Sequence, residues 1–200
     1  MIKNRKEYKI YLQADLAAHC LTTWKWYHRF IHHVVYFQRL LREIEYYENT
    51  KKSIFWKTYL VYLKLRFHNL SIRLGLTIPR NAFGAGLSIA HYGSIVISGK
   101  ARIGIGCRIH SDVNIGELNG KAPVIGDRVF IGPGAKIYGD IKIGNNVAIG
   151  ANSVVNKDIP DNVTVAGVPS KIISNKGADE LSNQKSADLA EGLFDEIKEG

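Results

Sequence analysis

Between residues 97 and 155 the chain places an aliphatic residue at every sixth position, usually beside a glycine. A period of six is neither the alternation of an ordinary strand nor the 3.6-residue period of a helix. It is typical of a solenoid whose coils have three short, flat sides, with the aliphatic side chains pointing inward. The register consists of Ile97, Ile103, Ile109, Ile115, Ile125, Ile131, Ile137, Ile143, Ile149 and Val155.

A second set of small or aliphatic residues stands four positions after these and is expected to fill the insides of the corners. Glycine and asparagine near the corners, as in Gly144-Asn145-Asn146, suit backbone conformations that branched residues resist. An antiparallel sandwich would instead alternate with period two between irregular turns. The second set is Cys107, Val113, Val129, Ala135, Ile141, Val147, Ser153 and Ile159.

The register shifts once, because Ile115 and Ile125 are ten residues apart. Four residues have therefore been inserted around 117–123, and an insertion that preserves the register must loop out of the solenoid. Loops that leave a rigid scaffold often carry function.

The chain before the solenoid shows helical spacing of apolar residues. We expect helices over 8–20, 24–48 and 54–74, with Ser53 capping the third and Gly75 ending it. The first glycine of the chain is Gly75, which agrees with an uninterrupted helical part.

These elements give an α+β fold class with a helical domain over 1–75, a β-helix over 76–173 and an acidic tail over 174–200. In the tail, apolar residues would line one face of a short helix over 186–198. A frayed tail and a tail docked on the basic helices both remain open.

The net charge of +9 lies on the helical part, where residues 1–74 carry 14 Lys and Arg against 5 Asp and Glu. All three Trp lie there too. Core or oligomer contact explains aromatic residues at helical spacing most simply. A weak association of the basic helices with a membrane surface stays open, whereas no nucleic-acid-binding module is recognisable and no nucleic acid is expected.

Cysteine usage and the N-terminus predict a cytoplasmic protein. Cys20 and Cys107 fall in different segments and do not form a disulfide framework, and no signal-peptide core or long apolar span is evident. Cys107 occupies an inward position, so we reject it as a nucleophile. The His and Asp residues lack the spacing of metal ligands, and no metal is expected.

The candidate base is His91, in Ile89-Ala90-His91-Tyr92-Gly93 at the opening of the solenoid. A lone histidine is more often structural than catalytic. However, helices followed by hexapeptide coils, an interrupting loop and the closing Ala166-Gly167-Val168-Pro169 resemble the serine acetyltransferase family of hexapeptide acyltransferases. The resemblance covers roughly residues 8 to 173.

The resemblance implies a left-handed parallel β-helix and a homotrimer with active sites in the grooves between chains, with pairing into hexamers left open. It implies acetyl-CoA as co-substrate and no permanently bound cofactor, with His91 as the general base of a direct transfer. The family's CoA contacts fall on Gly132, Pro133, Ala151, Asn156, Lys157 and Lys171.

Three family positions differ and bear on the acceptor. Laid residue by residue, the family's aspartate that orients the catalytic histidine falls on Leu76. The aspartate just before that histidine falls on Ala90, and the second, acceptor-binding histidine falls on Ala122. A pocket for the ammonium and carboxylate of serine would need charged partners. The loop over 117–123 is also shorter than in the serine enzymes.

We therefore expect an acetyl-CoA-dependent O-acetyltransferase acting on a sugar or sugar-nucleotide in surface polysaccharide synthesis, because Ala90-His91-Tyr92-Gly93 and the segment 120–127 resemble the enzymes that decorate such polysaccharides. Serine O-acetyltransferase is the alternative, and a non-catalytic hexapeptide scaffold is a second one. The chain ends without the terminal isoleucine with which serine acetyltransferases engage cysteine synthase, so that complex is not expected.

The group that would orient His91 stays open at this stage: Asn81, Asp112 or a backbone carbonyl could serve. His110, one coil further on, could reach the same cleft or be structural.

Overall fold

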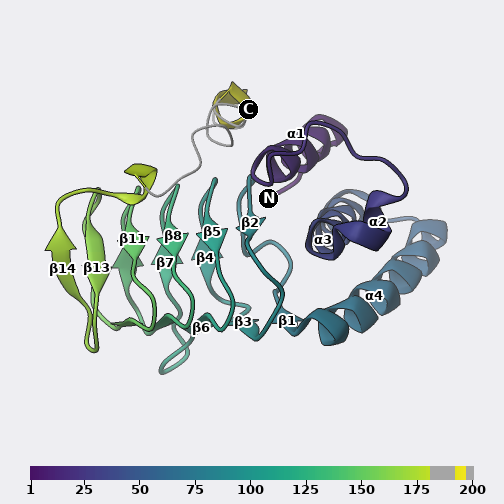
Figure 1. Ribbon diagram of the computed structural model, residues 1–200. Coiled ribbons are helices and arrows are strands. Elements are labelled where there is room, and N and C mark those ends of the chain that lie inside the picture. The colour runs from purple at the N-terminus through teal and green to yellow at the C-terminus, as the bar shows by residue number, and fades with distance from the viewer. Residues whose placement is uncertain (181–191, 197–200) are drawn as a thin grey trace.

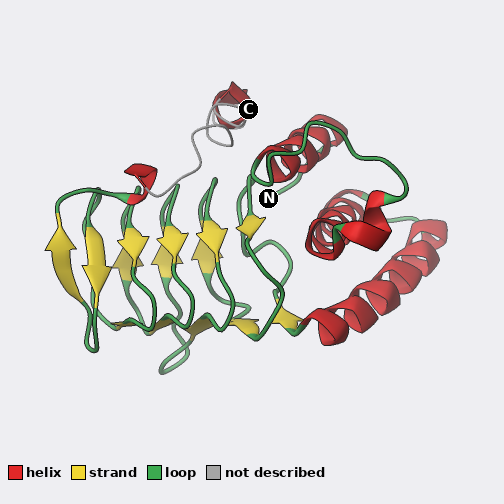
Figure 2. Cartoon of the chain, viewed as in Figure 1, coloured by secondary structure: helices red, strands yellow, loops and turns green. Residues whose placement is uncertain are grey.

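The computed structural model describes residues 1–180 and 192–196. Helices precede a parallel β-solenoid, and α3 packs against both α1 and α4 (Figures 1 and 2). The chain after β14 leaves the last coil through a short 3₁₀ helix at Ala178–Glu180. The helices are α1 (Arg5–Ala17), α2 (His28–Ile31), α3 (His33–Thr50) and α4 (Ile54–Leu74).

Two of the expected helices match α1 and α4, and the middle one is wrong in its first part. Residues 24–27 are not helical, α2 is a single turn, and His32 interrupts the backbone with φ −104° and ψ 68°. No residue of α2 is buried, so the aromatic spacing there does not reflect core packing. Helix α4 ends as expected at Gly75, which adopts the left-handed conformation with φ 68°.

Parallel strands from successive coils form the three sides of the solenoid. The β1 side contains β1 (Leu76–Thr77), β3 (Ile95–Ile97), β6 (Asn114–Gly116), β9 (Lys136–Tyr138) and β12 (Val154–Val155). The β4 side contains β4 (Arg102–Ile103), β7 (Val124–Ile125) and β10 (Lys142–Ile143). The β2 side contains β2 (Ser88–Ile89), β5 (Arg108–Ile109), β8 (Phe130–Ile131), β11 (Ala148–Ile149), β13 (Thr164–Ala166) and the antiparallel β14 (Lys171–Ser174).

The six-residue register is confirmed. Every aliphatic residue of the register is buried, and so is every member of the second inward set. On the β4 side Ile103 pairs with Ile125 and Ile125 with Ile143, so the coil that includes 117–123 is four residues longer than the next. The sequence thus located both the inward residues and the insertion.

The inserted loop is a small hairpin. The backbone amides and carbonyls of Leu118 and Lys121 bond to each other at 2.8 and 3.1 Å, around Asn119 and Gly120, which both have positive φ. An Asn-Gly pair is the preferred sequence for such a two-residue turn, so the sequence itself carries the signal for this hairpin.

A column of glycines lets successive coils stack at one corner. A Cβ added to Gly104 would lie 2.6 Å from the carbonyl oxygen of Gly126, and one added to Gly126 would lie 2.7 Å from that of Gly144. A side chain at either place would force the coils apart, so glycine is required by packing within the chain.

A buried ion cluster joins the helices to the first coil. Arg42 of α3 donates to Asp15 of α1 at 2.8 Å and to Glu45 at 3.0 Å, and all three side chains are almost fully buried. Asp15 also accepts from the backbone amides of Gly86 and Leu87. The surrounding core is continuous from α3 and α4 into the solenoid, so the helices hold the first coil in a fixed position.

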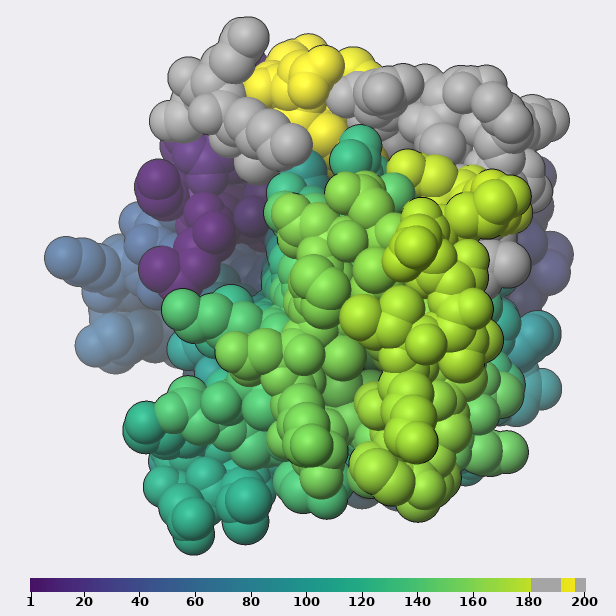
Figure 3. Space-filling view, turned by 90° about the vertical axis from the view of Figure 1, so that its left-hand side faces the viewer, coloured from purple at the N-terminus to yellow at the C-terminus, as the bar shows by residue number. Residues whose placement is uncertain are grey.

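Only part of the predicted tail helix over 186–198 lies within the described residues, and there residues 192–196 are helical. Phe194 packs with the buried cluster that includes Tyr11 and Ala85, and Glu196 lies 3.8 Å from Lys6. Figure 3, which views the molecule from the β14 end, shows this segment in yellow above the solenoid. Residues 192–196 therefore dock where α1 meets the first coil.

Candidate active site

His91 lies at a corner of the solenoid that is wider than its neighbours. Ile89 stacks on Ile109 on the β2 side, and Ile97 stacks on Ile115 on the β1 side. The inward residues of the two sides are therefore eight residues apart in the first coil and six residues apart in the next. The two additional residues hold the exposed His91 outside the packed core. The spacing from Ile89 to Ile97 was the sequence signal for this corner.

The corner is anchored on the end of α4. The amide of Gly93 donates to the carbonyl of Leu74 at 2.9 Å, and the amide of Ile95 donates to that of Gly75 at 3.0 Å. Gly93 has φ 144°, which only glycine adopts easily. The position of His91 thus depends on the helical part of the chain as well as on the solenoid.

A second imidazole lies beside His91 on the next coil. The ring centroids of His91 and His110 are 6.1 Å apart, and those of His110 and Phe130 are 5.1 Å apart. Nε2 of His110 is buried and has no hydrogen-bond partner in the described part of the chain. Burial, with the charges of Arg108 and His91, lowers the pKa of His110 below its ordinary value. His110 is therefore a neutral neighbour of the candidate base.

Of the groups considered for orienting His91, Asn81 is engaged elsewhere. Its side-chain Oδ1 accepts from Nδ2 of Asn49 at 3.0 Å, and its backbone amide donates to Glu45 at 2.6 Å. Asp112 is exposed at the corresponding corner of the next coil, directly after Ser111, whose Cβ lies against Gly93. Asp112 stays a candidate and Asn81 does not.

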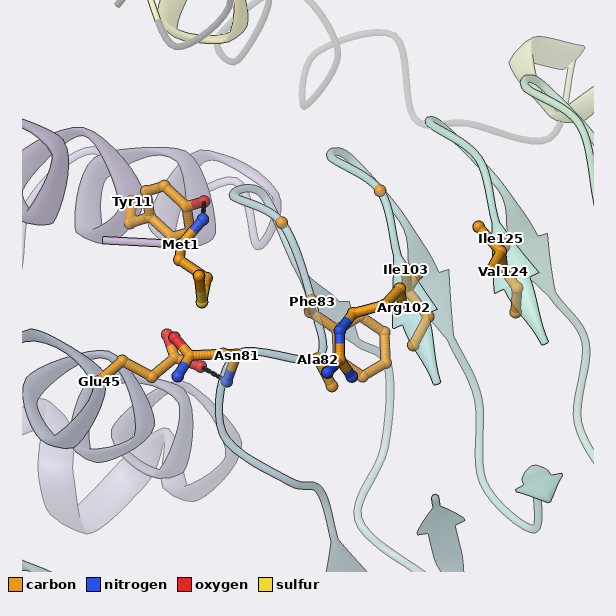
Figure 4. A pocket seen from close by; sticks show the side chains of 12 residues that line it. Met1, Tyr11, Glu45, Asn81, Ala82, Phe83, Arg102, Ile103, Val124 and Ile125 are labelled. Atoms are coloured by element: carbon orange, nitrogen blue, oxygen red, sulfur yellow. Dashed lines mark hydrogen bonds between the residues drawn. The ribbon is translucent and has the colours of Figure 1, made fainter. Parts of the chain in front are cut away.

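The side chains around Asn81 form a separate pocket between the helices and the β4 side (Figure 4). Met1, Tyr11 and Glu45 line it from the helical part, and Arg102 lines it from the solenoid. Among the described residues, its lining includes neither His91 nor any of the predicted CoA contacts. This hollow is therefore not the candidate site.

The predicted contacts for the pantetheine arm lie on the same edge of the solenoid as His91. Pro133 and Ala151 each stand two positions after a stacked strand residue, as His91 does, and the amide of Asn152 bonds to the carbonyl of Pro133 at 2.8 Å. Pro133 and Ala151 are exposed, whereas Gly132 is buried. A Cβ on Gly132 would lie 2.7 Å from the carbonyl oxygen of Ile149, which gives that glycine a packing role within the chain.

The polar residues predicted for the nucleotide end of CoA lie near the last coils. Asn156 and Lys157 follow β12, at the far end of the β1 side, and Lys171 begins β14. All three side chains are exposed. The structure thus arranges the predicted residues along the β1 side and its edges, with His91 at one end of the solenoid.

Two of the three positions that bore on the acceptor, Leu76 and Ala122, pack against the core. Leu76 is fully buried in β1 and points into the core, and the exposed neighbour is Thr77. Ala122 packs against the same core. A charged residue at Leu76 would lie inside the solenoid, so its absence there says nothing about an acceptor outside.

Cys107 is buried and its Sγ lies 3.3 Å from the carbonyl oxygen of Gly126. Burial raises the pKa of this thiol to about 12, so the thiolate that a nucleophile requires is not formed near neutral pH.

Comparison with known proteins identifies relatives for most of the chain. The family model for the bacterial transferase hexapeptide (six repeats) matches residues 122–157 of this chain. A serine acetyltransferase of Synechococcus elongatus is 37% identical over 119 residues, which are 57% of this chain and 49% of that protein. The chain spans about half the length of the curated relatives it matches.

Solved structures extend the similarity to the helices. A serine O-acetyltransferase from Brucella melitensis is 31% identical, with a TM-score of 0.65 over 86% of this chain and 71% of the other. The Neisseria gonorrhoeae serine acetyltransferase in complex with serine is 28% identical, with a TM-score of 0.62 over 85% and 70%. A serine acetyltransferase in complex with CoA is 25% identical, with a TM-score of 0.65 over 84% and 71%.

These similarities agree with the expected left-handed β-helix and correct the expected acceptor. A sugar or sugar-nucleotide acceptor is contradicted, because the relatives and the solved structures just described are serine acetyltransferases. Leu76, one of the positions on which that expectation rested, is buried in the core and cannot contact an acceptor.

Proposed function

The chain belongs to the hexapeptide-repeat transferases, and we propose that it is an acetyl-CoA-dependent O-acetyltransferase whose acceptor is the hydroxyl of serine. One observation carries the proposal: the fold that places His91 at an exposed, widened corner superposes on a serine acetyltransferase in complex with serine. The same fold in another relative holds CoA.

In this proposal His91 acts as a general base. It takes the proton of the serine hydroxyl while that oxygen attacks the thioester carbonyl of acetyl-CoA. The tetrahedral intermediate then expels the CoA sulfur, which receives the proton from the imidazolium. One ester bond forms and one thioester bond breaks, and the buried Cys107 has no part in the transfer.

The remaining roles follow from position. Asp112, at the corresponding corner of the next coil, orients His91. Pro133 and Ala151 lie along the same edge and contact the pantetheine arm, while Asn156, Lys157 and Lys171 bind the nucleotide end, where lysines suit phosphate. We place the protein in the cytoplasm, where acetyl-CoA is available.

A homotrimer would complete the site. The loop 117–123 leaves the corner between the β1 and β4 sides, whereas His91 lies at the corner between the β2 and β1 sides. Within one chain these corners are at opposite edges of the β1 side. In the assembly we propose, the loop of one copy reaches the His91 of the next.

The test is release of free CoA from acetyl-CoA by the purified protein with L-serine, with L-alanine as the matched acceptor that lacks only the hydroxyl. We expect release above the acceptor-free rate with serine alone, and O-acetylserine in the product mixture. Binding of acetyl-CoA without turnover on serine would refute serine as the acceptor.

A further inference from the structure

Helix α4 carries an apolar stripe that the described structure leaves uncovered. Ile54, Val61, Leu65 and Ile72 follow one another at intervals of seven, four and seven residues and share one face, and each is 57% to 68% exposed. Thr58, His68 and Asn69 lie on the same face and are also exposed. The opposite face of α4 packs against α3 and the core through Leu63, Phe67 and Leu74.

Cations line this stripe on both sides. Lys57 flanks it on one edge, and Arg66 and Arg73 flank it on the other, as the 100° spacing of helical residues dictates. Helix α4 contains no Asp or Glu at all. The acidic side chains of the adjoining α3 are already bound: Glu48 pairs with Lys64 and Arg80, and Glu43 accepts from Tyr59.

Aromatic contacts extend the surface from α4 to the segment around α2. The guanidinium of Arg66 lies 5.5 Å from the ring of Tyr62 and 5.6 Å from that of Tyr36, which in turn stacks on Trp24. Beyond Trp24, the exposed aromatic and cationic residues continue through Trp26, Tyr27, Arg29 and Phe30.

We propose that this basic, aromatic surface of α4 and residues 24–31 docks on an anionic lipid surface. Phosphate headgroups would meet Lys57, Arg66 and Arg73, while Ile54, Val61, Leu65 and Ile72 enter the boundary of the acyl chains. Trp and Tyr are the residues that prefer this interface. Lys57, Arg66 and Arg73, which flank the stripe along α4, fit a helix lying in the plane of the surface.

A second copy of the chain fits the surface less well. Two α4 faces laid together would bring cations against cations, with no acidic residue of either helix to pair them. Within the described residues, no helix is long and apolar enough to cross a bilayer.

The experiment is co-sedimentation of the full-length protein with vesicles of phosphatidylcholine alone and of phosphatidylcholine with an equal part of phosphatidylglycerol. We expect binding only to the anionic vesicles, and weaker binding when the salt is raised from about 0.1 M to about 1 M, which shortens the Debye length from about 10 to about 3 Å. Each cation near such a surface strengthens binding about fivefold, so K57Q with R73Q should weaken it by about 25-fold.

The apolar contribution is tested with matched pairs of substitutions. V61S with L65S should reduce binding to the anionic vesicles by at least about tenfold. V168S with I173S, which remove exposed apolar residues at the opposite end of the solenoid, should leave it unchanged. Circular dichroism confirms that each variant is folded.

Two outcomes would overturn the proposal. One is equal affinity for neutral and anionic vesicles, or none for either. The other concerns the apparent mass of the protein in sedimentation without lipid. If this mass rises with protein concentration and is lower in the double variant V61S with L65S, the stripe joins two copies of the chain. Neither outcome depends on the acceptor of the transferase reaction.

Discussion

The imidazole rings of His91 and His110 lie side by side on successive coils, with their centroids 6.1 Å apart. Their surroundings differ, because His91 is exposed at the widened corner, while Nε2 of His110 is buried and the ring centroids of His110 and Phe130 are 5.1 Å apart. Of the two rings, only that of His91 belongs to an exposed residue, and His91 therefore stays the candidate base.

Replacing His91 by alanine should remove the base without disturbing the fold, because the side chain is exposed. We expect kcat for CoA release to fall by roughly 10²–10⁴-fold, while the affinity for acetyl-CoA, measured by calorimetry, stays nearly the same. The control is His33→Ala, another exposed histidine, at the start of α3. Turnover retained in His91→Ala would contradict the assignment of the base.

The depressed pKa of His110 should be visible by NMR titration. Burial, Arg108 and His91 all disfavour its charged form, so its imidazole should titrate below the ordinary value of 6.5. The unfolded chain then takes up the proton first on acidification, and this residue makes the fold less stable as pH falls below about 6.5. Arg108→Gln should move the pKa of His110 upward. A titration at or above 6.5 in the unsubstituted protein would contradict the burial of this ring.

The glycine column should tolerate no side chain. Gly104→Ala would press a methyl group against the carbonyl of Gly126, and we expect the free energy of unfolding to fall by about 1–3 kcal/mol in urea titrations. Gly99→Ala is the matched control, because no atom lies within 4 Å of a Cβ added there. Equal stability of the two variants would show that the coils move apart freely.

The solenoid could be predicted from the sequence because its inward residues repeat with one period, so Ile97 to Val155 identified the core without any knowledge of the helices. The same reasoning failed at the start of the expected helix 24–48, where residues 24–27 are not helical and no residue of α2 is buried in the core of the chain. Spacing reports burial only where a neighbouring element exists to cover it.

The prediction of His91 as the base came from a resemblance, and the wrong acceptor came from departures from the same family's motif at Leu76, Ala90 and Ala122. Laying a motif residue by residue assumes that each position points the same way, and Leu76 in β1 points inward. The widened corner that exposes His91 and its anchor at Gly93 are long-range features, since they depend on the end of α4. Such contacts leave little trace in a local pattern.

The ion cluster of Asp15, Arg42 and Glu45 should be the most sensitive link between the helices and the first coil. Burial alone would lower the pKa of Arg42, but the two carboxylates outweigh it and raise the value, so this guanidinium stays charged. Its Nη atoms also donate to the carbonyls of Phe83 and Gly84, at 3.0 and 2.6 Å. Arg42→Met keeps the bulk of the side chain but leaves two carboxylates and two carbonyls buried without their donor.

We expect Arg42→Met to lower the free energy of unfolding by about 3–5 kcal/mol, measured from urea titrations at pH 7, because an unpaired buried charge keeps its full desolvation cost. Lys176→Met is the control: it removes an ion pair with Glu180 in which both side chains are mostly exposed, and should leave stability unchanged. If Arg42→Met were as stable as that control, the helices would be held to the solenoid by the shared apolar core alone. The geometry argues against that outcome. Asp15 accepts from the backbone amides of Gly86 and Leu87 in the first coil and, at the same time, from the guanidinium of Arg42 in α3.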